Sequence, residues 1–238
     1  MSRPRQTSFV AALLLLSVSF LHAQNAPDPS GHWEGSAAAG GFSTTFQVDL
    51  AKNSQGELIG TFTGQDVKNL PLAKVAVEGQ SLTFYTRADS PFRGMLSAAG
   101  TSVSGEVVIS GYVVPASMRR TGAARLEPPP TSAPIGKELE GTWNGTLVAS
   151  TGPLRLVLTM ANQDGRSIGR IVNVDEGGLT IPFVITQKAS SVNLESPSVA
   201  GSFSGELNAE GTELAGAWTQ GGVSLPLTFR RAATESRR

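Results

Sequence analysis

Residues 140–145 read EGTWNG, and residues 30–35 read SGHWEG. The chain contains only three tryptophans, and these two stretches hold two of them in nearly the same setting. Each stretch opens a Gly-rich region of short apolar runs. We therefore expect the chain to contain two copies of one small β domain, each opened by a tryptophan.

The similarity continues through both halves of the chain. LPL at 70–72 corresponds to IPF at 181–183, and FRGMLSAAGTSVSGEV at 92–107 corresponds to FSGELNAEGTELAGAW at 203–218. The spacing between the copies is far longer than the roughly 20 to 50 residues of a solenoid repeat. This spacing indicates a duplicated domain.

The duplication predicts a chain of five parts. They are a signal peptide at 1–23, a first β-barrel at 30–120, a Pro-rich linker at 121–139, a second β-barrel at 140–231 and a tail at 232–238. The linker has four prolines and no apolar periodicity. We expect an extended, semi-rigid spacer that couples the two halves weakly.

The N-terminal segment has the composition of a secretory signal peptide. Arg3 and Arg5 precede an apolar run at 9–16, which is too short to span a bilayer. We expect cleavage after Ala23, with an uncleaved anchor as the alternative. The mature chain is then secreted or periplasmic in a bacterial envelope and has no transmembrane segment.

The composition favours an all-β protein and excludes several functions. Glycine is abundant (27 residues), charged residues make up 16%, and cysteine is absent. Without cysteine there are no disulfides, thiolate nucleophiles or lipid-modified cysteines. The basic residues are scattered and form no stripe, so a nucleic-acid partner is not expected.

The second copy contains eight short alternating runs joined by short links, which predicts an up-and-down antiparallel order. Eight such strands can close into a barrel and remove both sheet edges. The fold predicted is all-β, with two tandem eight-stranded antiparallel up-and-down barrels. Leu156, Leu158 and Met160 share one face, which predicts an apolar lumen and a wet exterior. The runs lie at 142–149, 153–161, 166–172, 179–187, 190–196, 202–208, 213–219 and 223–230.

Two Trp–Arg pairs are expected to close the barrels. Trp143 begins the first strand of the second copy, and Arg231 ends its last strand on the same face. In a closed barrel these strands are neighbours, so the guanidinium can stack on the indole and reach backbone carbonyls. Trp33 and Arg120 repeat the arrangement in the first copy.

The motifs GHW at 31–33 and GTW at 141–143, with an Arg on the last strand, resemble those of lipocalin and avidin-like (calycin) barrels. The second copy also resembles the N-terminal module that precedes the α/β-hydrolase domain in secreted bacterial serine hydrolases. The run GAWTQGGVSLPLTFRR carries much of this resemblance. In those enzymes a separate domain holds the nucleophilic serine, and GSFSG at 201–205 has Phe203 at that position. The family's catalytic residues therefore carry over to no residue of this chain.

Few residues suggest chemistry. His32, the one histidine after the predicted signal peptide, is expected on the outer surface. Asp175 and Glu176 are adjacent on a predicted loop, where a solvated turn is favoured over a calcium site or an acid–base pair. Trp218 and Gln220 are the candidate ligand-binding residues at the barrel rim, although Gln220 as a backbone cap is the alternative.

Inward glycines leave a further choice open. They can enlarge a pocket, or they can let bent strands cross closely. The glycines of this kind are Gly94, Gly105, Gly205 and Gly216.

The sequence thus predicts a non-enzymatic binding module for a small apolar ligand or a partner protein. No catalytic residues, cofactor or metal are expected. An accessory subunit that acts in trans with a secreted serine hydrolase, or a structural envelope protein, is the alternative.

Overall fold

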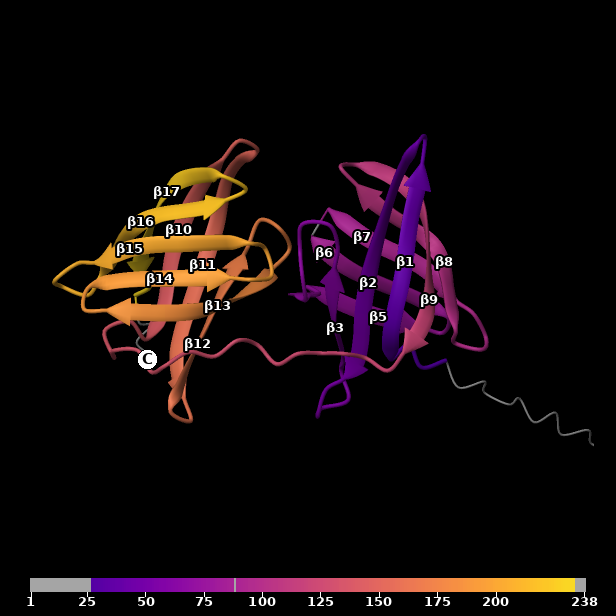
Figure 1. Cartoon of the computed structure of the whole chain (residues 1–238), viewed down its shortest axis with the longest axis horizontal. Helices are drawn as coiled ribbons and strands as arrows, with labels where there is room; N and C mark the ends of the chain where they lie inside the picture. Colours follow the sequence, from indigo (N-terminus) through magenta and orange to yellow (C-terminus); the bar gives the residue numbers. More distant parts are fainter. Residues whose placement is uncertain (1–26, 88, 234–238) are drawn as a thin grey trace, which may run out of the picture.

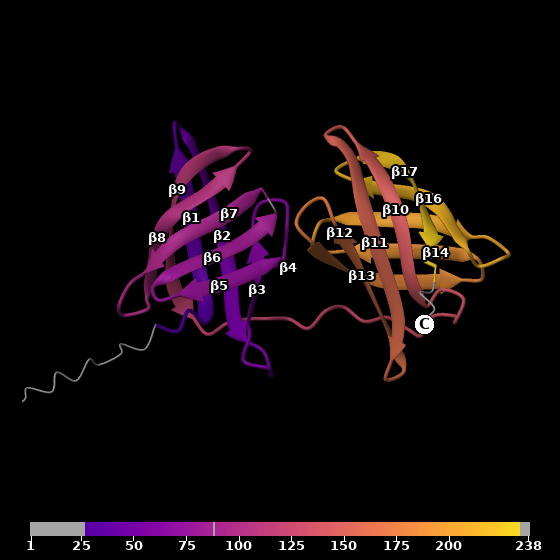
Figure 2. The same cartoon turned by 180° about the vertical axis from the view of Figure 1, so that it is seen from behind.

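The computed structural model describes residues 27–87 and 89–233. Two β units lie side by side, and an extended segment that connects them runs along one end of both (Figures 1 and 2). The described residues form seventeen strands and no helix, and all strand pairs are antiparallel. The prediction of an all-β protein is confirmed.

The second unit is a closed barrel of eight antiparallel strands, as predicted. Closure occurs where the last strand pairs with the first, with Trp143 opposite Arg231 and Gly145 opposite Phe229. The strands are β10 (Gly141–Ala149), β11 (Gly152–Gln163), β12 (Arg166–Asn173), β13 (Leu179–Lys188), β14 (Ser191–Ser196), β15 (Gly201–Leu207), β16 (Glu213–Gln220) and β17 (Val223–Arg231).

The first unit is a nine-stranded sheet in the order β4-β3-β2-β1-β9-β8-β7-β6-β5. The prediction of a closed eight-stranded barrel is wrong for this half, because no ladder joins the edge strands β4 and β5. The strands are β1 (Gly31–Ala39), β2 (Phe42–Lys52), β3 (Leu58–Thr63), β4 (Leu70–Pro71), β5 (Lys74–Glu78), β6 (Ser81–Arg87), β7 (Ser90–Leu96), β8 (Ser102–Ile109) and β9 (Tyr112–Gly122).

The extra strand arises because the first half has two short strands, β4 and β5, where the second half has the single strand β13. Leu72, directly after β4, donates its N–H to the Gly60 carbonyl on β3. The next residue, Ala73, donates its N–H to the Tyr85 carbonyl on β6. In the second half, β13 makes this change of partner without a break, since Phe183 pairs with β12 and Val184 with β14. The pairing of β3 with β4 covers only two residue pairs, so the strand is divided there.

A polar contact limits the pairing of β3 with β4. The Asn69 N–H donates to the Thr63 hydroxyl at 3.0 Å. This side chain takes the place of a backbone acceptor at the end of β3. In the first half, the two edge strands β4 and β5 are therefore joined only by the chain itself, through Leu72 and Ala73. In the second half, the continuous strand β13 pairs with both of its neighbours.

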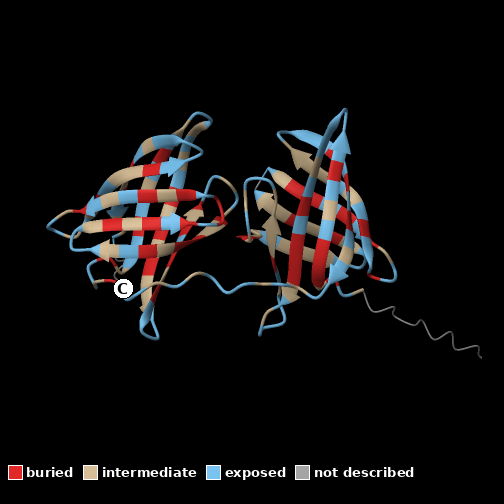
Figure 3. Cartoon of the chain, in the orientation of Figure 1, coloured by how far each residue is buried: buried red, intermediate tan, exposed pale blue. Residues whose placement is uncertain are grey.

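The alternation of buried and exposed residues follows the predicted phase. Leu156, Leu158 and Met160 are buried on β11, as are Leu227 and Phe229 on β17. Figure 3 shows buried residues alternating with exposed ones along the strands of both units. Each unit thus has its own apolar core.

The facing glycines allow close crossing of strands. Gly205 pairs with Gly216, and a Cβ on Gly216 would lie 2.1 Å from the Ser204 carbonyl oxygen. A Cβ on Gly205 would lie 2.6 Å from the ring of Phe203. The space that these glycines leave is occupied by backbone and by an aromatic ring, which favours close crossing over a pocket.

The linker is held against both units, whereas the sequence predicted an extended, semi-rigid spacer that couples the halves weakly. The Arg125 N–H donates to the Asp49 carboxylate at 2.7 Å, and Ser132 forms a β-bridge with Ser167. Ile135 and Leu139 are buried in the second core. These apolar side chains anchor a Pro-rich segment that has little periodicity of its own.

The two halves also contact each other directly. Leu70 of β4 is 3% exposed and belongs to the second core, and Val67 packs against that core. The Lys68 N–H donates to the Ser198 carbonyl at 2.9 Å. The loop between β3 and β4 therefore joins the first half to the second.

Candidate functional site

Trp143 of β10 lies opposite Arg231 of β17 at the seam of the second barrel. The indole is fully buried and donates from Nε1 to the Leu139 carbonyl at 3.0 Å. The Arg231 guanidinium lies 4.2 Å from the ring centroid. It donates to the carbonyls of Gly211 at 2.8 Å and Glu140 at 2.7 Å, and also to the Glu138 carbonyl.

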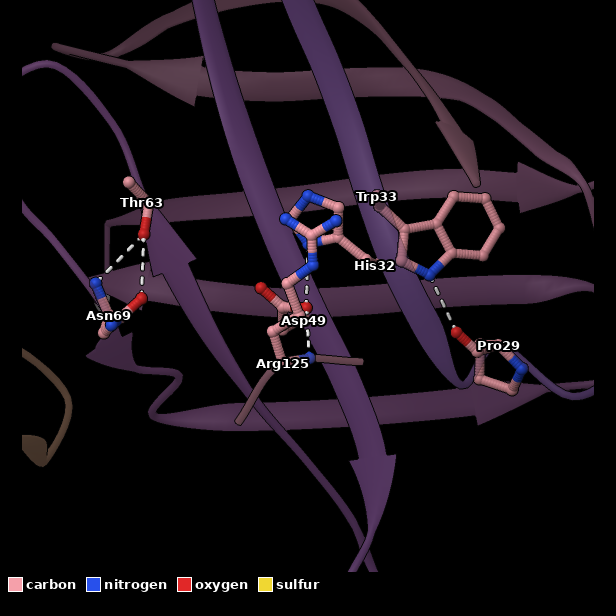
Figure 4. Close-up of polar contacts among 7 residues, drawn as sticks. All are labelled: Pro29, His32, Trp33, Asp49, Thr63, Asn69 and Arg125. Carbon is pink, nitrogen blue, oxygen red and sulfur yellow. Dashed lines mark hydrogen bonds and ion pairs between the residues drawn. The ribbon is translucent and has the colours of Figure 1, made fainter. Parts of the chain in front are cut away.

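Trp33 and Arg120 have the same arrangement in the first half. Trp33 is fully buried and donates to the Pro29 carbonyl at 2.8 Å (Figure 4). The Arg120 guanidinium lies 4.9 Å from the centroid of the Trp33 ring. Arg120 also donates to the Asp28 carbonyl. Both pairs consist of packing and backbone contacts, so their arrangement supports a structural role.

Trp218 and Gln220 contact each other beside the second core. Trp218 is 8% exposed and meets Phe183 edge to face at 6.0 Å between centroids. Its Nε1 donates to the Gln220 amide oxygen at 3.2 Å, and the Gln220 amide nitrogen donates to the Val199 carbonyl at 2.8 Å. The Gln220 side chain links the indole to the loop before β15, an arrangement typical of a structural cap.

His32 is buried, so the prediction that it lies on the exposed surface is wrong. The ring Nδ1 lies 2.8 Å from the Asp49 carboxylate, which also accepts the Arg125 N–H (Figure 4). His32 does point outward from β1, but the linker covers this part of the outer face. No local pattern in the sequence showed that cover.

Asp175 and Glu176 are ion-paired. The Asp175 carboxylate accepts the Arg155 N–H at 2.6 Å and the Arg155 guanidinium at 2.5 Å. These hydrogen bonds hold the pKa of Asp175 below its usual value. Glu176 pairs with Arg87 of the first half. The predicted solvated turn is thus an ion-paired loop between the halves.

A groove lies on the outer face of the first half. Its volume is about 1030 Å³, and exposed hydroxyl, amide and charged side chains line it. One row of lining residues crosses β3, β2, β1, β9 and β8 in register, and consists of Thr63, Gln47, Glu34, Arg119 and Ser102. A second row crosses β2, β1, β9 and β8, and consists of Thr45, Ser36, Ser117 and Ser104.

The second half has a smaller groove of about 740 Å³ in the equivalent place. Two of its lining cations are paired, Arg155 with Asp175 and Arg230 with Glu213. Val157 and Val174 replace polar residues there. We therefore select the groove of the first half, here called the polar groove, as the candidate site.

Sequence reasoning missed the polar groove. Its residues are common surface types, and they come together because five strands align in register. The alternation of Glu34 with Ser36, and of Ser117 with Arg119, was visible in the sequence. Which strands lie side by side was the missing information.

Neither a metal cluster nor a membrane-spanning helix occurs in the part of the chain that the structure describes. No group of three or more histidine, cysteine, aspartate or glutamate residues there is arranged to hold an ion. No helix in residues 27–87 and 89–233 is long and apolar enough to cross a bilayer.

The comparison with protein-family models gave no match, and the comparison with curated proteins gave none either. Among solved structures, the chain is similar to a candidate outer membrane protein of Bacteroides fragilis, with 10% identity and a TM-score of 0.26, over 85% of this chain and 97% of that one. A protein of unknown function from the DUF3598 family of Nostoc punctiforme has 15% identity and a TM-score of 0.24, over 88% and 97%. Kievitone hydratase from Nectria haematococca has 11% identity and a TM-score of 0.25, over 86% and 90%. These scores carry no argument about function.

Proposed function

We propose that this chain is a non-enzymatic binding protein of the bacterial envelope, which recognises a partner protein through the polar groove. The observation that carries this proposal is the pair of polar rows across five strands of the first half. Hydroxyl and amide side chains both donate and accept hydrogen bonds, so such a surface can satisfy the backbone of a bound segment.

A protein partner fits the groove better than a small apolar ligand does. The groove is open to solvent, whereas sites for small ligands are enclosed. In the second barrel, Phe203 and Phe229 meet edge to face at 5.5 Å between centroids, so aromatic rings occupy the interior. Both features support recognition on the outer face.

The envelope location and the resemblance to calycin barrels are part of the same proposal. The location rests on the signal-like segment at 1–23, which lies outside the described residues. The resemblance rests on the GxW motifs, on Arg120 near the end of β9 and on Arg231 at the end of β17.

Site-specific photo-crosslinking tests the proposal. A photoreactive amino acid at Ser117, in the polar groove, should give a discrete crosslinked protein in envelope extracts. The same group at Ser204, an exposed position on the second barrel, should not. Equal products from both positions, or none from Ser117, would refute the groove as the recognition site.

Bulky substitutions supply a second test. Ser36→Arg with Ser117→Arg fills the polar groove, and Ser204→Arg with Ala215→Arg adds the same bulk to exposed positions elsewhere. Only the first pair should abolish partner capture. Recovery of a secreted hydrolase as the partner would identify the chain as an accessory subunit.

Two further measurements address the other functions. A small molecule retained in native mass spectrometry, or a fluorescent fatty acid bound at micromolar concentration, would favour a carrier. Turnover of ester or peptide substrates by the isolated chain would contradict a non-enzymatic role.

A further inference from the structure

Four hairpins at one end of the two units contain no charged residue. In the first half they are the β1–β2 hairpin within 35–48 and the β8–β9 hairpin within 107–118. In the second half they are the β10–β11 hairpin within 141–154 and the β16–β17 hairpin within 214–229.

The four hairpins belong to one structural position in each unit. β1 pairs with both β2 and β9, and β9 pairs with β8, so the two hairpins of the first half are neighbours. The same holds for β11, β10, β17 and β16 in the second half. In Figures 1 and 2, all four tips lie at the same end of the molecule, opposite the linker.

The tips carry exposed apolar side chains. Phe42 is 47% exposed, Tyr112 76% and Val113 59% in the first half. Val148 and Val223 are exposed in the second half. Here these five residues are called the apolar tips. They are separate from the polar groove, because none of them lines it.

We propose that the apolar tips dock the protein on the interface of an uncharged lipid bilayer. Phe and Tyr next to small residues suit the boundary between headgroups and acyl chains, where an aromatic ring is buried and a hydroxyl stays wet. The lack of lysine and arginine in the four hairpins means that attraction to anionic lipids contributes little.

The shape of the surface favours lipid over a protein partner. A stable protein interface buries about 1,600 Å² in a contiguous, well-packed patch. The apolar tips are instead separate points on glycine-containing turns, such as those at Gly41 and Gly111. A fluid bilayer accepts separate points without matching their shape.

The test is binding to vesicles by the chain from Gln24 to Arg238, which contains every described residue and lacks the apolar signal-like segment. We expect the chain to bind pure phosphatidylcholine vesicles, and we expect this binding to persist in about 0.5 M salt. Salt at this concentration screens surface charges, so binding that depends on an uncharged surface is not weakened by it. Phe42→Ser with Tyr112→Ser should lower the partition coefficient by about tenfold or more for each side chain lost.

The matched control is Ile59→Ser with Met95→Ser, which removes two exposed apolar side chains away from the tips. This control should bind like the native chain. Circular dichroism melting of both variants verifies that they remain folded.

A spectroscopic readout complements the partition measurement. The native tryptophans are buried, so Phe42→Trp adds one exposed indole. Its emission should move to shorter wavelength when phosphatidylcholine vesicles are added. The proposal is overturned if the native chain does not bind, if the tip variant binds equally well, or if binding requires anionic lipid and disappears in salt.

Discussion

Arg231 combines an aromatic contact with three hydrogen bonds to backbone carbonyls at the end of the second barrel. A guanidinium presents planar donors in several directions, whereas a lysine ammonium cannot span the same acceptors. The carbonyls come from two loops, before β10 and before β16. The side chain therefore ties both loops to the buried Trp143.

Arg231→Lys should lower the free energy of unfolding by about 1–3 kcal/mol. The lysine ammonium cannot reach all three carbonyl oxygens, so some of these acceptors are left without a charged donor. Chemical denaturation measures the change. Arg230→Lys is the control, since Arg230 is exposed and pairs with Glu213 at the surface. Such a pair contributes only about 0–1 kcal/mol. Equal losses for both variants would contradict the closing role of Arg231.

Asp175 predicts a pH dependence of stability. Its pKa is lowered in the folded chain by the hydrogen bonds from Arg155. The stabilisation is therefore present above the unfolded-state pKa of about 3.9 and is lost as the pH falls through the lower folded value.

Asp175→Asn should reduce the melting temperature at pH 7, and the difference from the native chain should shrink as the pH falls below about 4. Thermal melts between neutral and acidic pH test this. Glu206→Gln, at an exposed position on β15, should show no such convergence. A constant difference at all pH values would mean that ionisation of Asp175 is not the cause.

The facing glycines act at the scale of the strands. Gly205 and Gly216 bring β15 and β16 together closely enough that a methyl group would strike backbone atoms. Gly94 and Gly105 do the same between β7 and β8, where a Cβ on Gly105 would lie 2.0 Å from the Arg93 carbonyl oxygen. The same close crossing of two strands therefore occurs in both halves.

Gly216→Ala should destabilise the second barrel by about 1–3 kcal/mol, because the backbone must shift to relieve the overlap. Gly122→Ala is the matched control, since a Cβ there meets no atom within 4 Å. Denaturation curves of the two variants provide the comparison. A neutral Gly216→Ala would show that the glycine pair is not required for the crossing.

At the scale of the whole molecule, the loop from β3 to β4 couples the halves. Leu70 belongs by sequence to the first copy and by packing to the core of the second. Leu70→Ala should therefore destabilise the second barrel by about 2–5 kcal/mol, the usual cost of truncating a buried leucine.

Hydrogen exchange followed by mass spectrometry localises this effect. Leu70→Ala should accelerate exchange in β13 and β14. Leu82→Ala, in the core of the first half, should accelerate it in β6 and β7. If Leu70→Ala affected only the first half, the contact between the halves would not contribute to stability.

Sequence alone predicted the features that depend on local pattern. Alternation along β11 and β17 identified the inward faces, and the positions of Trp143 and Arg231 predicted their encounter across the barrel seam. Strand periodicity and short connections are local properties of the chain, so they can be read from it directly.

Contacts between distant segments were decided by the tertiary structure. His32 is buried because the linker crosses its strand, Leu70 lies in the core of the other half, and the polar groove exists because five strands align. Nothing in the neighbouring residues encodes these contacts. The sequence determined two β units with apolar interiors, since periodicity dictates which face is buried. The packing of the linker and of the two units decided which outward residues are covered and which remain exposed, because these contacts join segments that are far apart in the sequence.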